Sequence, residues 1–331
     1  MPGTQEFTYL NHGAETVKGT PVAPQRMWLG DATGVLGEDL TKTLHEGERR
    51  GRRAVAWRIS SLAEDASIKL SGEPTFDDMW WPLSSFNGTT TGVGGSADKT
   101  AAFAPSMTAA TNSQKSSSVD GGDDVQNWRF QYVMWSRFKL TSALSKTTRI
   151  EGDLFAQRAI KTAKATPAVP AFSPKILGEL WTLKQAATFA GLPGASVLTT
   201  TLVDSSLELW TGLKPEHYQD GNPYFAQNVE TEFDGKFTAT VESTAGVISG
   251  FYDKWKADTL DYLRWKNTSP VVLGASFPSL QFDFAIYYTN VQKIADQRDG
   301  VNLYKIEGRL VDDGSNPLVS PTLVSALTAL P

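Results

Sequence analysis

The most regular alternation of hydrophobic and polar positions lies between Phe277 and Asp312. In its first half the apolar positions recur at every second residue: Leu280, Phe282, Phe284, Ile286 and Tyr288. In its second half Tyr304, Ile306, Gly308 and Leu310 alternate with Lys305, Glu307 and Arg309. A period of two is typical of a strand with one buried face. We therefore predict an antiparallel pair, joined by a polar connection over Asn290–Gly300. Asp283 of the first strand is expected to share a charged face with the three charged residues of the second, toward solvent or a lumen.

Similar patterns predict strands over much of the chain. Residues 128–140 and 147–155 are expected to pair as a hairpin, and shorter strands are expected at 54–62, 68–71 and 198–210. Asp234-Gly235, between apolar runs at 225–233 and 236–242, is the strongest short hairpin signal. The expected fold class is mainly β, an antiparallel β-sandwich or barrel with a flanking α-helix.

Two segments have helical features. Residues 74–82 begin with Pro74 and acidic residues and end at Pro82, which is expected to stop a short helix. Trp80 and Trp81 are adjacent in it, so we expect one to pack on the sheet and the other to lie at an interface. The strongest predicted helix spans 249–265. For 176–190 the pattern leaves helix and mixed structure open.

Four segments show little periodicity, within what we treat as a single domain over 1–331. Residues 1–47 read as an extended arm with short strand pieces, and the Gly/Ser/Thr-rich residues 84–127 as a long loop. Residues 162–221 begin with an Ala/Pro-rich connection and form a possible insertion or outward-facing subdomain. Residues 316–331 are an apolar C-terminal extension interrupted by Pro317 and Pro321, expected to lie along the fold or on a neighbour.

Composition narrows the classes of function. The net charge of -5 argues against general nucleic-acid binding through basic patches. It does not argue against a channel that surrounds DNA without binding it tightly. Because the chain has no cysteine, disulfides, thiolate metal sites and cysteine nucleophiles are excluded. No secretory signal and no apolar run long enough for a membrane span are found, so we expect a protein made in the cytoplasm.

The candidate chemical motifs are weak. In the Gly-rich segment 92–100 a phosphate-binding loop would need glycines where Asp98 and Val93 stand. Aspartates cluster at 77/78, 120/123/124, 296/299 and 312/313, and the middle two clusters lie in loops that could hold calcium, although solvated turn positions are the commoner role. His12, His45 and His217 lack ligand spacing and are expected at surface or turn positions. We predict no catalytic residue, cofactor site or metal site.

Ten tryptophans suggest one enzyme-like or sugar-binding alternative. A carbohydrate-binding or glycoside-processing β protein would use tryptophan faces as sugar platforms and a pair of carboxyl groups as acid and base. Most of these tryptophans sit inside amphipathic patterns, as core residues do. The core interpretation is therefore preferred.

In the order of its features, the chain resembles the major tail tube proteins of phages with long, non-contractile tails. The resemblance rests on an arm from Gly13-Ala14-Glu15-Thr16-Val17-Lys18-Gly19-Thr20-Pro21, the long loop, the helix and a closing pair that ends in 299–308. It implies a β-sandwich or barrel whose copies form rings, six to a ring, that stack into a conduit for DNA. It also implies partners among other tail proteins (tape measure, tail terminator and distal tail proteins) and a place in the virion, with no membrane contact.

This resemblance makes assembly the expected function, with another virion component, such as a capsid-decorating or tail-terminator protein, as a further alternative. Long amphipathic strands have edges that must be paired, and a closed ring pairs them between copies. The simpler interpretation of the basic cluster at 49–53 is that these residues are solvent-exposed at the start of a strand. The positions expected at subunit contacts are Thr20, Pro21, Arg49, Arg50, Arg52, Arg53, Trp80, Trp81, Lys99, Asp123, Asp124, Lys305, Glu307 and Arg309.

Overall fold

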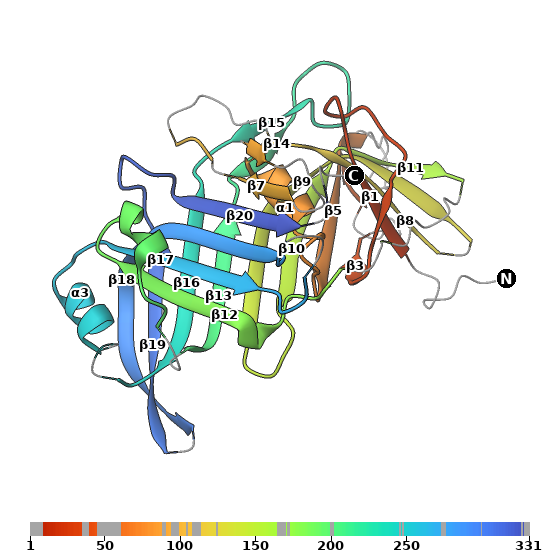
Figure 1. Ribbon diagram of the computed structural model, residues 1–331. Helices are drawn as coiled ribbons and strands as arrows, with labels where there is room; N and C mark the ends of the chain where they lie inside the picture. Colours follow the sequence, from red (N-terminus) through yellow and green to blue (C-terminus); the bar gives the residue numbers. More distant parts are fainter. Residues whose placement is uncertain are drawn as a thin grey trace.

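The computed structural model is mainly β and antiparallel, as predicted. It describes residues 9–34, 40–44, 61–87, 91–93, 99–103, 105–107, 114–123, 125–163, 170, 173–198, 202–244, 246, 248–272, 276–298, 300–325 and 327. Two layers of strands cross steeply, and a third group of strands extends from one end of them (Figure 1).

The back layer is a continuous ladder of strands and strand halves. Their order is β3 (Asp31–Thr33) with β4 (Leu40–Leu44), β5 (Ser61–Gly72), β10 (Arg149–Ala156), β9 (Asn127–Ala143), β13 (Leu202–Trp210), β16 (Asp234–Glu242), β19 (Val301–Leu310) and β18 (Ser279–Arg298). The predicted hairpin of 128–140 with 147–155 is confirmed as β9 and β10.

The front layer is built on the first half of β18. Its order is β12 (Trp181–Ala186), β17 (Asp261–Thr268), β18, β20 (Val319–Ser325), β7 (Lys99–Ala102) and β6 (Thr91–Val93). The third group is β2 (Arg26–Trp28), β1 (Tyr9–Ala14), β8 (Ser117–Gly122), the first half of β9, and β11 (Arg158–Thr162). A separate small pair joins β14 (Leu213–Glu216) to β15 (Gln227–Glu230).

Two long strands connect these groups. β18 pairs with β17 up to Ile286 and with β19 from Ile286 onward, with a bulge between Tyr288 and Asn290. β9 changes partners near Tyr132, whose φ is 53°. Bends and bulges of this kind let strands pass from one sheet to another at the corners of orthogonal sandwiches.

Glycine allows close packing at the β18 corner. A Cβ on Gly308 would lie 2.5 Å from side-chain carbons of Ile286 and 2.8 Å from the carbonyl oxygen of Tyr287. Real Cβ atoms do not come that close, so a side chain here would push β18 and β19 apart. Gly308 therefore lets β18 leave one layer and enter the other.

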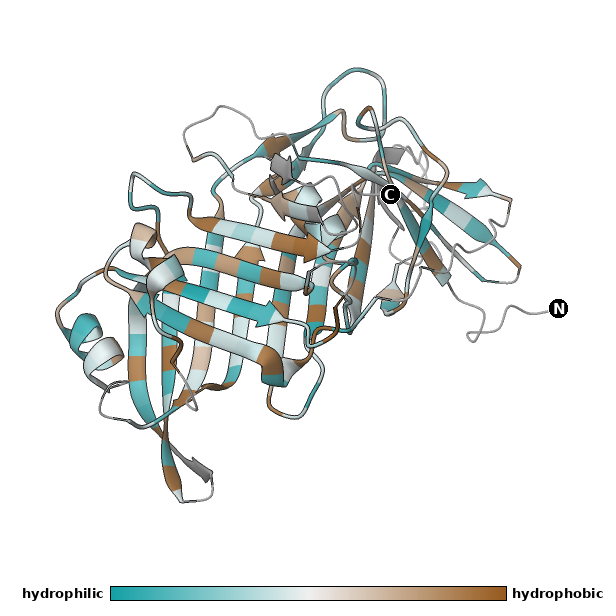
Figure 2. Ribbon diagram, viewed as in Figure 1, coloured by the Kyte–Doolittle hydropathy of each residue, from teal (hydrophilic) through white to brown (hydrophobic). Residues whose placement is uncertain are grey.

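The core between the layers is rich in aromatic residues. Trp265 of β17 stacks on Trp181 with ring centroids 3.6 Å apart, and Phe282 and Phe237 lie against the same indole at 5.8 Å. Figure 2 shows hydrophobic and hydrophilic residues alternating along strands of both layers. Six of the described tryptophans are buried, as expected of core residues: Trp28, Trp80, Trp81, Trp135, Trp181 and Trp265.

Several predicted elements are wrong in detail. The helix expected over 249–265 is limited to a π turn at Ile248–Tyr252 followed by α3 (Asp253–Lys256), and Trp265 belongs to β17. The Asp234-Gly235 hairpin does not form, because Gly235 is buried inside β16 between Leu209 and Leu310. Pro82 does not stop its helix but lies in the first turn of α1 (Trp80–Asn87).

The segments without periodicity also contain structure. Residues 162–221, expected as a possible insertion or outward-facing subdomain, contribute β12 and β13 to the two main layers. The long loop at 84–127 includes β8, which is buried throughout. The 316–331 extension contains β20, in which Pro321 lies opposite Phe282 and accepts a hydrogen bond from the Phe103 amide. The strand pieces of the arm lie on the protein's own strands.

Candidate assembly surfaces

The outer face of the back layer carries a charge ladder that crosses five strands. The register places Glu151, Lys139, Glu208, Lys236 and Arg309 side by side on β10, β9, β13, β16 and β19. Opposite charges alternate along the first four of these positions. Cross-strand pairs of opposite charge stabilise a sheet modestly, by about 0.2–1 kcal/mol each. The face is thus broad, polar and mixed in sign.

In the next row of the same face, the side chain of Arg137 lies between two acidic side chains. Arg137 donates to Asp153 at 2.9 Å and to Glu208 at 2.5 Å. Burial by itself would lower the pKa of Arg137, but the hydrogen bonds and charges of the two acids together outweigh it, and the pKa is raised. The guanidinium therefore ties β10, β9 and β13 together on their outer side.

The predicted contact residues Lys305, Glu307 and Arg309 do share one face of β19. Lys305 lies 2.7 Å from Glu307, and this hydrogen bond lowers the pKa of the Glu307 carboxyl. Arg309 donates from Nε to Asp234 at 2.8 Å, and this bond raises the pKa of Arg309. The charges are thus largely paired within the chain.

Asp283, expected to share that charged face, lies on the other layer. It is 7% exposed and accepts a two-pronged hydrogen bond from Arg264 of β17 at 2.7 and 2.8 Å. The expectation is wrong because β18 crosses between layers after Ile286. On this second face Lys266 lies near Arg264 and Lys184, and burial together with these two charges lowers the pKa of Lys266.

The β18–β19 pair extends beyond the rest of the back layer as a projecting hairpin (Figure 1). The predicted polar connection over Asn290–Gly300 is wrong, since β18 continues to Arg298 in register with Val301. Among the described strands, none pairs with β18 on the β17 side beyond Ile286. The segment around α3 packs near the start of the second half of β18, through Phe251 against Tyr288. Beyond it this side of β18 is an open sheet edge among the described residues, which is able to pair with a strand of another chain.

The arm residues Thr20 and Pro21 are exposed at the end of a tight loop. The loop is held from inside by Glu15, which accepts hydrogen bonds from the amides of Gly19 and Tyr132 and the hydroxyls of Ser116 and Ser118, at 2.6–2.9 Å. The two predicted contact positions therefore sit on a rigid projection.

Trp80 and Trp81 do not form a surface. Both are buried, and their indole nitrogens donate to Ser325 at 2.7 Å and Ser117 at 3.0 Å. The prediction that one of them lies at an interface is wrong, because α1 is enclosed within the fold and buries both indoles. Each tryptophan instead fixes a neighbouring segment to α1.

The remaining predicted positions are scattered. Lys99 begins β7 at the edge region of the front layer, and Asp123 caps a turn through the amides of Val125 and Gln126. The structure does not bring these two together with β19. Arg49, Arg50, Arg52, Arg53 and Asp124 lie outside the described residues, as do most of the strand predicted at 54–62 and His45.

Two of the carboxylate clusters make internal connections, whereas Asp312 and Asp313 accept hydrogen bonds from the amides of a surface turn, and Asp299 lies outside the described residues. Asp78 accepts from Arg26 at 3.1 Å and from the Thr75 amide, and Asp120 pairs with Arg129 at 2.7 Å. In the part of the chain that the structure describes, no group of three or more acidic or histidine side chains is placed to hold a metal ion. His217 is exposed, as predicted, but the surface position expected for His12 is wrong, since it is 1% exposed.

Sequence patterns missed one feature of the charged face. Trp210 ends β13 beside Asp234, Lys236 and Arg309, and with Thr289 these residues line a surface cavity of about 380 Å³. Trp210 is half-buried at the end of an alternating strand, so the sequence pattern could have placed it on this face. The sequence pattern could not show the strand order that brings β13, β16, β19 and β18 together.

No protein-family model matches this chain, and no curated protein matches it either. No helix among the described residues is long and apolar enough to cross a membrane. The class that the structure itself defines is an antiparallel β-sandwich with a projecting hairpin and a mixed-charge outer face.

Proposed function

We propose that the protein is a structural subunit that polymerises into rings, six copies to a ring, and that the rings stack into a phage tail tube. The observation that carries the proposal is the open edge of β18 on the projecting hairpin. A long unpaired edge invites pairing with another chain, and repeated pairing around a closed ring leaves no free edge.

The charged face supports the same function. Its ladder alternates in sign between β10 and β16. Such a face is suited to a neighbouring copy with complementary charges, and it lacks the excess of cations that would hold DNA by its phosphates. In this proposal DNA passes through the ring without sequence-specific contact, and the tail proteins implied by the resemblance bind the tube at its ends and in its lumen.

Sedimentation velocity over a series of protein concentrations tests the proposal. We expect a discrete species of several copies, about six, to grow at the expense of the monomer as concentration rises. A variant in which residues 293–304 are replaced by Asn-Gly, a two-residue hairpin turn, provides the matched control. A single monomer peak for the unmodified chain at every concentration and salt condition would contradict the proposal.

A further inference from the structure

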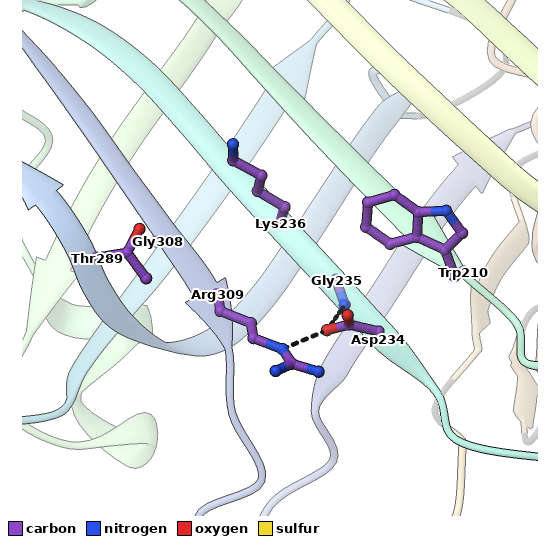
Figure 3. Close-up of a pocket in the computed structure, with 7 residues that line it drawn as sticks. All are labelled: Trp210, Asp234, Gly235, Lys236, Thr289, Gly308 and Arg309. Atoms are coloured by element: carbon purple, nitrogen blue, oxygen red, sulfur yellow. Dashed lines mark hydrogen bonds and ion pairs between the residues drawn. The ribbon is translucent and has the colours of Figure 1, made fainter.

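The surface cavity on the charged face combines an aromatic wall with two cations. Figure 3 shows Trp210 on one side, Thr289 on the other, and Lys236 and Arg309 between them. The lining comes from four strands of one rigid sheet, β13, β16, β18 and β19. Such a cavity keeps its shape without a ligand, which lowers the entropic cost of binding.

The two cations are register partners on neighbouring strands, and their charged ends point apart, that of Arg309 toward Asp234 and that of Lys236 away from it (Figure 3). Lys236 belongs to β16 and Arg309 to β19, and their side chains are 47% and 64% exposed. Lys236 also lies 3.8 Å from Glu307, which is outside the lining and is paired more closely with Lys305. Like charges in directly opposite positions destabilise a sheet. An anion bound at the exposed end of Arg309 would add a negative charge beside this pair of cations.

The charge of the lining indicates the kind of anion. Asp234 accepts the hydrogen bond from Arg309 Nε, which leaves the terminal guanidinium nitrogens at the far end of the group (Figure 3). Two cations and one carboxylate give the lining a net charge of about +1. This charge matches a single carboxylate better than a phosphate dianion, which Asp234 would repel.

The aromatic wall indicates what carries the carboxylate. The indole of Trp210 lies diagonally across from Lys236, since Trp210 is the register partner of Asp234. An indole presents a broad apolar surface of negative potential, against which the C–H face of a sugar ring packs. Asp234 and Thr289 add polar atoms at the rim, where hydroxyl groups would lie.

We propose that this cavity binds an acidic saccharide of the uronic acid class, with the sugar ring against Trp210 and its carboxylate on the terminal guanidinium nitrogens of Arg309. Binding involves no covalent step. All of the residues that line the cavity belong to one chain, so the unassembled protein contains the whole site, although the same face is proposed to contact a neighbouring copy.

Ligand-observed NMR with a trimer of galacturonic acid tests the site, with the neutral galactose trimer, acetate and inorganic phosphate as comparison ligands. We expect binding of the acidic trimer alone. Arg309→Gln and Trp210→Leu should each weaken it at least tenfold. Lys139→Gln, on the same face but outside the cavity, should leave it unchanged, and circular dichroism checks that every variant folds.

Three results would overturn the proposal. Equal binding of the neutral trimer would show that the two cations play no part. Binding of acetate or phosphate as strong as that of the trimer would show an adventitious ion only. No binding of the acidic trimer by the folded protein would rule the site out, whatever the sedimentation experiment shows about assembly.

Discussion

The imidazole of His12 lies parallel to the indole of Trp81, with ring centroids 4.2 Å apart and planes 5° apart. His12 belongs to β1 and Trp81 to α1, so the stack joins the N-terminal arm to the core. Burial, with a contribution from the nearby charge of Arg26, lowers the pKa of His12 to about 3. The arm is therefore held by a histidine that must stay neutral.

This arrangement predicts a pH-dependent loss of stability. The folded pKa of His12 lies below the unfolded value of 6.5, so the unfolded chain takes up a proton first as the pH falls. The stability is present above about pH 6.5 and is lost progressively toward pH 3. Between about pH 7 and pH 5 we expect the unfolding free energy in urea to fall by about 2 kcal/mol more than in His12→Phe. Equal pH dependence in the two proteins would contradict the prediction.

A side chain at Gly308 should destabilise the corner of β18. The new Cβ would lie 2.5 Å from Ile286, so Gly308→Ala must displace β18 or β19. We expect the unfolding free energy to fall by about 1–3 kcal/mol, the usual range for overpacking. Gly194→Ala is the control, because nothing lies within 4 Å of the place that a Cβ would take there. A Gly308→Ala variant as stable as Gly194→Ala would show that the corner has room.

Removing the Glu15 carboxylate should release the arm loop. Glu15 accepts four hydrogen bonds, from the loop, from Ser116 just before β8, from β8 and from β9. In Glu15→Ala these donors lose a charged partner, and we expect a loss of about 3 kcal/mol together with faster proteolysis near Thr20. Glu151→Ala, on the exposed outer face, should change stability by less than about 0.5 kcal/mol. Unchanged proteolysis in Glu15→Ala would show that the loop is held by other contacts.

Shortening the projecting hairpin should separate folding from assembly. Gln292 and Lys305 are register partners, so an Asn-Gly turn between them closes β18 and β19 without residues 293–304. The core contacts of Ile286, Ile306 and Leu310 remain, so we expect a cooperative thermal transition but no higher-order species in sedimentation. Assembly equal to that of the unmodified chain would place the contact elsewhere.

Alternating patterns predicted strands where the buried face of the strand is apolar. Phe282, Phe284 and Ile286 face the core, and their pattern was plain in the sequence. Beyond Asn290 the hairpin projects, fewer of its residues reach the core, and the alternation that marks a strand disappears. The strand there was therefore mistaken for a connection.

Two other features, strand β17 and the order of the strands, were also missed for physical reasons. Asp261, Leu263, Trp265 and Asn267 are buried at every second position of β17, but two of these four residues are polar, so the segment resembled a helix. Asp261 is accommodated inside by Tyr288, Gln185 and Lys254. The candidate surfaces depend on strand order, which no local pattern contains. The charges on β19 were predicted, whereas their partners Asp234 and Lys236 on β16 were not.

Negative-stain electron microscopy of the purified protein at high concentration tests ring formation without an intermediate inference, because it shows the shape of the assembly. We expect rings with a central hole, and stacks of such rings as concentration rises. Isolated particles of monomer size at high concentration, across a range of salt conditions, would contradict it.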